Sequence, residues 1–96
     1  MQVPIILKKN DIPKLSKYAK LKFDIVRNKW IINAPERVLE INESAAEILQ
    51  LINGKYSIKT ITNKLKIKNS NAPKDKILKD VIKLLQLLAD KRFVIK

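Results

Sequence analysis

The sequence predicts an α+β domain in which a three-stranded antiparallel meander is followed by three helices. Between residues 21 and 41, apolar and polar residues alternate in three short runs that turn residues separate, which is typical of half-buried strands. After Asn42, apolar residues recur at the i, i+3, i+4, i+7 spacing of one helical face. Ninety-six residues are enough for one small domain with its own core. Strands before helices is an order that resembles a winged-helix arrangement.

The three strands are expected over residues 21–26, 30–34 and 37–41. Asn28 is the residue of the first turn best able to adopt a positive φ, and Pro35 suits the first central position of the second turn. In the third strand, side chains alternate between two faces, with Leu39 and Ile41 on one face and Val38 and Glu40 on the other. Trp30 is expected in the core between the sheet and the helices.

The first helix begins after either Asn42 or Ser44, and the sequence leaves both N-caps open. Gly54, the one glycine of the chain, is expected to end this helix as a left-handed C-cap. Ser57 caps a second helix that extends to about residue 67, a polar connector covers 66–72, and the last helix runs from about 73 to 91. The apolar tail at 93–95 is expected to fold back onto the domain.

The chain divides into an N-terminal arm, residues 1–19, and a domain, residues 20–96. Val3, Ile5 and Leu7 alternate with other residues, which is compatible with a short extended arm. The longest apolar run near the N-terminus, residues 4–7, is too short for a signal peptide or a membrane span. We therefore expect no membrane association. The absence of cysteine fits a cytoplasmic location, which we also expect.

The composition argues against an enzyme. The chain contains no cysteine and no histidine, which removes a thiolate nucleophile, the usual general base and the commonest ligands of transition metals. None of the nine acidic residues pair into an acid/base signature, and no glycine-rich phosphate loop is present. We expect no catalytic residue, no metal and no cofactor.

The net charge of +12 attracts nucleic acid, anionic membranes or acidic peptides. Because the excess comes from lysine and only three arginines are present, base readout in nucleic acid is disfavoured. Lys76, Lys79 and Lys83 share one stripe of the last helix, which is either a solvated face or an electropositive wall for an acidic peptide.

Several motifs together resemble the PqqD family of pyrroloquinoline quinone biosynthesis. They are Phe23-Asp24-x-x-Arg27-x-x-Trp30, Pro35-Glu36-Arg37, Asn42-x-x-Ala45-x-x-Ile48-Leu49, Gly54 and Asp80-Val81. The resemblance covers about residues 21–92. It implies a RiPP recognition element, a non-catalytic domain that binds the leader of a precursor peptide as an added strand along the third strand, against the last helix. In that pathway the domain presents PqqA to PqqE, a radical SAM enzyme with iron–sulfur clusters. A glycine common in the family after the last helix is replaced here near Lys91 and Arg92.

The sequence and the resemblance together predict a peptide chaperone whose partners are a precursor peptide and a radical SAM enzyme. Its predicted peptide-binding residues come from the third strand and the last helix: Arg37, Val38, Leu39, Glu40, Ile41, Lys76, Lys79, Asp80, Lys83, Leu84 and Leu87. Whether the Val38 N–H points outward from the sheet stays open at this point. The rivals are a DNA-binding winged helix, which the charge favours, and an oligomerisation module that pairs edge strands, so either a monomer or a dimer is compatible with the sequence.

Overall fold

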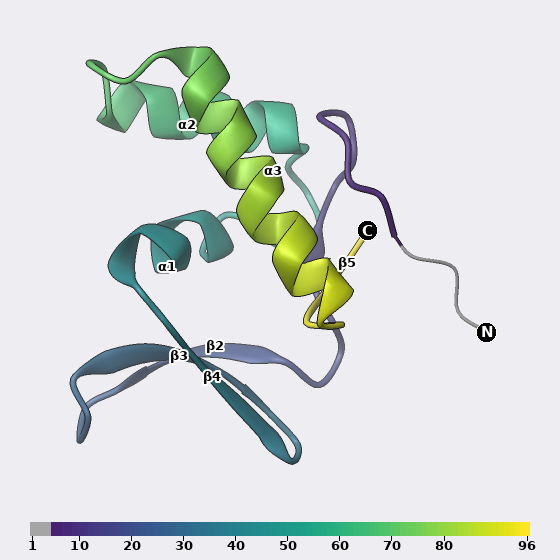
Figure 1. Ribbon diagram of the computed structural model, residues 1–96, viewed down its shortest axis with the longest axis vertical. Helices are drawn as coiled ribbons and strands as arrows, with labels where there is room; N and C mark the ends of the chain where they lie inside the picture. Colours follow the sequence, from purple (N-terminus) through teal and green to yellow (C-terminus); the bar gives the residue numbers. More distant parts are fainter. Residues whose placement is uncertain (1–4) are drawn as a thin grey trace.

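The computed structural model describes residues 5–96. A meander of strands is followed by three helices, and two short strands from the chain ends form a second, smaller sheet (Figure 1). The elements are β1 (Lys14–Leu15), β2 (Lys20–Asp24), β3 (Lys29–Ala34), β4 (Arg37–Ile41), α1 (Glu43–Leu49), α2 (Ile58–Lys68), α3 (Lys74–Asp90) and β5 (Val94–Ile95). The predicted α+β class and the strands-then-helices order are confirmed.

The meander has the strand order β2-β3-β4 and is antiparallel throughout. Asn28 adopts the predicted positive φ of 56°, and Glu36, after Pro35, has a φ of 64° in the two-residue turn before β4. The prediction that the first strand reaches residue 26 is wrong. Ile25 and Val26 lie in the turn and are 85% and 96% exposed, because the chain has already left the sheet after Asp24.

The structure decides between the two N-caps of α1 in favour of Asn42, whose Oδ1 accepts a hydrogen bond from the Ala45 N–H at 2.8 Å. Ser57 caps α2 as predicted and accepts from the Thr60 N–H at 3.1 Å. The expected C-cap at Gly54 is wrong, because α1 ends at Leu49.

Gly54 does have a positive φ of 78°, but its role is in tertiary structure. Its N–H donates to the Pro13 carbonyl at 3.3 Å, and the neighbouring Asn53 forms an isolated β-bridge with Lys14. The glycine therefore serves the contact between the segment after α1 and the N-terminal arm.

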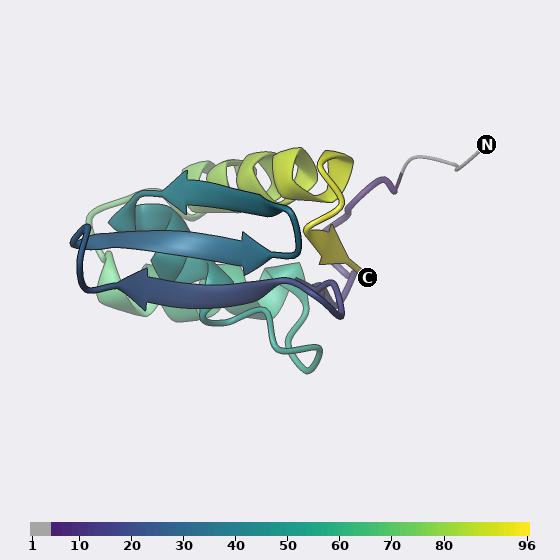
Figure 2. The ribbon, with the colours of Figure 1, turned by 90° about the horizontal axis from the view of Figure 1, so that it is seen from below.

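The core lies between one face of the meander and the helices, which cover that face together (Figure 2). Ile32 is the residue of the central strand that enters it, and the helices contribute most of the rest. The fully buried side chains include Ile32, Ile58, Ile61, Val81, Leu85, Leu88 and Val94.

The N-terminal arm is tied into the domain. Leu7 is 4% exposed, and the Gln86 side chain of α3 holds the arm by accepting from the Leu7 N–H at 2.9 Å and donating to the Ile5 carbonyl at 2.7 Å. β1 pairs with β5, and Phe93 and Val94 are buried, so the predicted fold-back of the C-terminal tail is confirmed. Val3, part of the predicted extended arm, lies outside the described residues.

Candidate functional site

One side of β4 has no partner strand among residues 5–96, since β4 pairs only with β3. Ala34 and Arg37 are partners on either side of the two-residue turn, and a turn of this length closes on a pair that exchanges hydrogen bonds. The alternation of the antiparallel ladder then directs the backbone of Leu39 and Ile41 toward β3. It directs the N–H and C=O groups of Val38 and Glu40 outward, which settles the orientation that the sequence left open.

The side chains of β4 alternate as predicted. Leu39 and Ile41 are half-buried and pack against the core, whereas Val38 is 55% exposed on the opposite face of the sheet. The edge therefore offers free backbone N–H and C=O groups, and the packing of Leu39 and Ile41 against the core holds the strand in place. Such an edge is a ready template for an added strand.

Arg37, predicted to bind peptide, is exposed and contacts the end of α3 and the segment after it. Its Nη1 donates to the carbonyl of Lys91 at 2.8 Å, and its guanidinium lies 4.2 Å from the centroid of the Phe93 ring. These contacts join the first residue of β4 to the end of α3. Arg37 thereby links the start of β4 to the end of α3.

In Figure 2, α3 lies behind the meander on the side of β4, while β2 is the strand farthest from it. A mainly apolar hollow on the exposed side of α3 has a lining that comes from this helix alone: Asp80, Ile82, Lys83, Leu84, Gln86, Leu87 and Asp90. Leu87 is 53% exposed although it is a large apolar residue in a regular helix. The structure thus brings together four of the predicted residues of the last helix.

The remaining two predicted lysines of α3 do not line this hollow. Lys76 lies one helical turn before Asp80 and pairs with its carboxylate at 3.7 Å. Lys79 is exposed, and by helical geometry it lies about 100° around the axis from Asp80. Lys76, Lys79 and Asp80 give this part of α3 a mixed charge.

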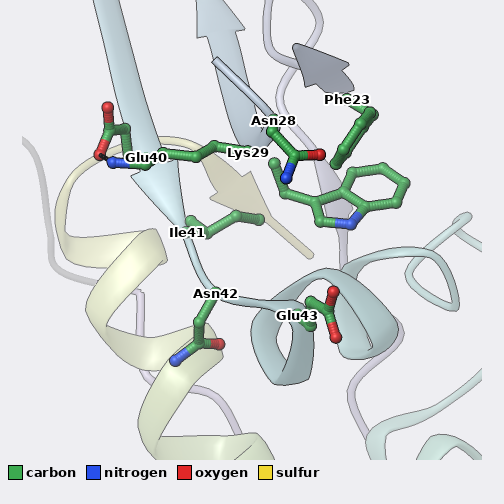
Figure 3. A pocket seen from close by; sticks show the side chains of 8 residues that line it. Phe23, Asn28, Lys29, Glu40, Ile41, Asn42 and Glu43 are labelled. Atoms are coloured by element: carbon green, nitrogen blue, oxygen red, sulfur yellow. Dashed lines mark hydrogen bonds and ion pairs between the residues drawn. The ribbon is translucent and has the colours of Figure 1, made fainter. Parts of the chain in front are cut away.

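A second hollow opens where β4 ends and α1 begins (Figure 3). Its walls include Phe23, Trp30, Glu40 and Glu43. The rings of Phe23 and Trp30 meet edge to face, with centroids 5.3 Å apart and planes at 68°. The prediction that Trp30 is a core residue is wrong: its side chain is only half-buried and lies outside the core.

The reason lies in the lengths of the elements. Trp30 faces the same side of the sheet as Ile32, but it sits opposite Ile41 at the end of the meander. There the short helix α1 is only beginning, so the inner face of the sheet is left open. Sequence reasoning missed this pocket, although Phe23 and Trp30 are cross-strand partners that a hairpin alignment could have found.

Among residues 5–96, no group of three or more His, Cys, Asp or Glu side chains could hold a metal ion. None of the helices described is long and apolar enough to cross a membrane. The described residues offer three surface features: the open edge of β4, the apolar hollow on α3 and the aromatic pocket at the end of β4.

Comparison with known proteins identifies the family of this chain. The sequence model of the family described as Coenzyme PQQ synthesis protein D (PqqD) matches residues 29–94. The chain belongs to the PqqD family. A "PqqA binding protein" from Bradyrhizobium diazoefficiens is 50% identical over 82 residues, which cover 85% of this chain and 79% of that protein. The bifunctional coenzyme PQQ synthesis protein C/D of Methylorubrum extorquens is 33% identical over 89 residues, which are 93% of this chain but 24% of that longer protein.

Two solved PqqD structures resemble this fold. The solution NMR structure of the PqqD truncation of Methylobacterium extorquens PqqCD aligns with a TM-score of 0.81 at 31% identity and covers 97% of this chain and 98% of that one. That protein is described as a functional, stand-alone RiPP recognition element. The crystal structure of PqqD from Xanthomonas campestris aligns with a TM-score of 0.55 at 31% identity, over 90% of this chain and 94% of that one. The resemblance read from the sequence motifs is confirmed.

Proposed function

We propose that this chain is a peptide chaperone that binds the leader of a ribosomally made, PqqA-like precursor peptide as an added strand on β4. The observation that carries the proposal is the outward backbone of Val38 and Glu40, on an edge with which no strand of residues 5–96 pairs. Relatives described as PqqA binding proteins and the recognition-element description of a similar structure support it. Backbone pairing supplies affinity in this binding mode, and pockets beside the edge supply specificity.

The predicted residues take different roles in this proposal. Val38 and Glu40 pair with the peptide through their backbone, while Leu39 and Ile41 hold the edge in place from behind. The apolar face of α3, Leu84 and Leu87, receives apolar peptide side chains, with Asp80 and Lys83 contacting polar ones. Lys76 and Lys79 act at longer range, as part of the positive field that attracts an acidic peptide. Arg37 links the start of β4 to the end of α3 rather than touching the peptide.

The chemistry on the peptide belongs to a partner enzyme in this proposal, a radical SAM protein of the PqqE type. A chain without cysteine cannot supply the thiolate ligands of an iron–sulfur cluster. This chain would deliver the peptide in the cytoplasm, where it is synthesised, and would itself carry no cofactor and catalyse no step in pyrroloquinoline quinone or related biosynthesis.

The decisive test compares Val38→Pro with Val38→Ala in binding the PqqA peptide of Bradyrhizobium diazoefficiens. Proline removes the outward N–H and leaves the ladder to β3 intact, while alanine shortens the side chain but keeps the donor. We expect Val38→Pro to weaken binding about tenfold or more, because the peptide carbonyl that pairs with the Val38 N–H would be left without a donor. Val38→Ala keeps that donor and should weaken binding less than about threefold. Circular dichroism checks that both variants are folded.

Equal affinities of the two variants would contradict strand addition. The DNA-binding rival is tested with the same protein by titrating duplex DNA at two salt concentrations. A steep salt dependence together with amide shifts confined to α2 would favour that rival.

A further inference from the structure

The pocket at the end of β4 combines aromatic rings with an unpaired negative charge. Phe23, Asn28 and Glu43 converge on it from the hairpin and from the start of α1 (Figure 3). Glu40 also lines it, but its carboxylate lies 3.3 Å from the ammonium group of Lys29, so the charges of this pair offset each other. Glu43 makes no ion pair with any of the residues described.

The position of the pocket relates it to the β4 edge. Glu40 and Ile41 belong to both, so a strand that pairs along β4 passes the mouth of the pocket at one end. Trp30 lies on β3 opposite Ile41, and an added strand would lie two strand spacings from β3, about 9–10 Å away. A peptide side chain must cross Ile41 to reach the indole, and only the longest side chains can do so.

We propose that this pocket is a subsite for one positively charged side chain, arginine or lysine, of the peptide that pairs with β4. The inference rests on the proposed function. An aromatic face attracts a cation, and the Glu43 carboxylate attracts it further. On a surface of net charge +12, such a site discriminates strongly, because a cation is repelled almost everywhere else. The subsite would fix the register of an otherwise acidic peptide along the strand.

The test uses the PqqA peptide of Bradyrhizobium diazoefficiens and variants in which each arginine is replaced by citrulline and each lysine by norleucine. The chain has one tryptophan, so its fluorescence and its indole N–H signal report on this pocket alone. We expect one neutral variant to lose the Trp30 response and to bind about three- to tenfold more weakly, as for a partly exposed cation–π contact with a carboxylate. Its shifts at the Val38 and Glu40 amides should remain.

A second experiment replaces Glu43 by glutamine, with Glu36→Gln as the matched control. Glu36 carries the same charge, lies in the turn at the opposite end of β4 and also lacks an ion pair among the residues described. Glu43→Gln should weaken the parent peptide about three- to tenfold and should have no further effect on the neutral variant. Glu36→Gln should affect both peptides equally.

The outcomes separate the two proposals. Shifts at Val38 and Glu40 without a Trp30 response, or equal affinities for all peptides, would overturn the cationic subsite and leave strand addition standing. Absence of any shift at Val38 and Glu40 would overturn the proposed function and the subsite with it.

Discussion

The contacts of Arg37 with the end of α3 and with Phe93 predict how much this side chain contributes to the free energy of unfolding. Its guanidinium lies over the ring of Phe93, a residue that is 3% exposed, and donates to the Lys91 carbonyl at 2.8 Å. A partly exposed cation–π contact contributes about 0.5–1 kcal/mol, and a hydrogen bond of this kind contributes about 1 kcal/mol. Arg37→Ala should therefore lower the free energy of unfolding by about 1.5–2 kcal/mol. For a domain of this size that is a Tm lower by roughly 6–16 °C.

Thermal unfolding followed by circular dichroism measures this change, and two variants calibrate it. Arg37→Lys keeps the charge but loses the planar stack, so it should lie between the wild type and Arg37→Ala. Arg27→Ala removes the same side chain from the β2–β3 turn, where Arg27 makes an exposed ion pair with Asp24 at 3.7 Å. It should cost less than about 0.5 kcal/mol. If Arg37→Ala were no more destabilising than Arg27→Ala, the contacts of Arg37 with the end of α3 would not contribute to the stability of the fold.

Three further predictions follow from particular residues. Arg92 has a φ of 69° after α3, so Arg92→Gly should raise the free energy of unfolding by about 0.5–1 kcal/mol in urea titration; a loss would contradict a strained left-handed position. Ile32→Ala should lower the free energy of unfolding by about 3–4 kcal/mol because Ile32 is 0% exposed, whereas Trp30→Ala should lower it by only about 1–2 kcal/mol. Equal losses would show that Trp30 contributes to stability as a core residue does. Lys83→Glu should weaken peptide binding and flatten its salt dependence more than Lys79→Glu in calorimetric titrations at two salt concentrations, since Lys83 lines the α3 hollow and Lys79 does not. Equal effects would show that only net charge matters.

The strain at Arg92 has a clear structural setting. The Arg92 N–H donates to the Ala89 carbonyl and the Phe93 N–H to the Leu88 carbonyl, both at 2.9 Å. These bonds form the Schellman end of a helix, whose left-handed residue is usually glycine. The glycine that is common in the PqqD family after the last helix is replaced at this place. The structure shows why a glycine belongs there.

Local signals in the sequence were sufficient for much of the fold. The bounds of β4, the positive φ at Asn28 and the cap at Ser57 each depend on neighbouring residues, and each was predicted correctly. The pairing of β1 with β5 could not be predicted, because two-residue strands have no measurable periodicity. Gly54 was assigned to a helix end because its partner, the arm at Pro13, is distant in the sequence.

In the candidate site, too, some features could be predicted from the sequence and others depend on tertiary contacts. The faces of β4 follow from alternation alone, so Val38 and Leu39 were placed correctly. The outward direction of the Val38 N–H needed the register of the β3–β4 turn. The exposure of Trp30 depends on where α1 starts over the sheet, and the internal role of Arg37 depends on the fold-back of Phe93. Tertiary contacts of this kind leave no periodic pattern in the sequence.

Strand addition on β4 is tested most directly by amide hydrogen exchange at single-residue resolution, without and with the PqqA peptide of Bradyrhizobium diazoefficiens. In the free protein, the ladder to β3 should already protect the Leu39 and Ile41 amides, while the Val38 and Glu40 amides exchange rapidly. Bound peptide should slow exchange at Val38 and Glu40 and change Leu39 and Ile41 little. Unchanged exchange at Val38 and Glu40 under saturating peptide would contradict the central claim.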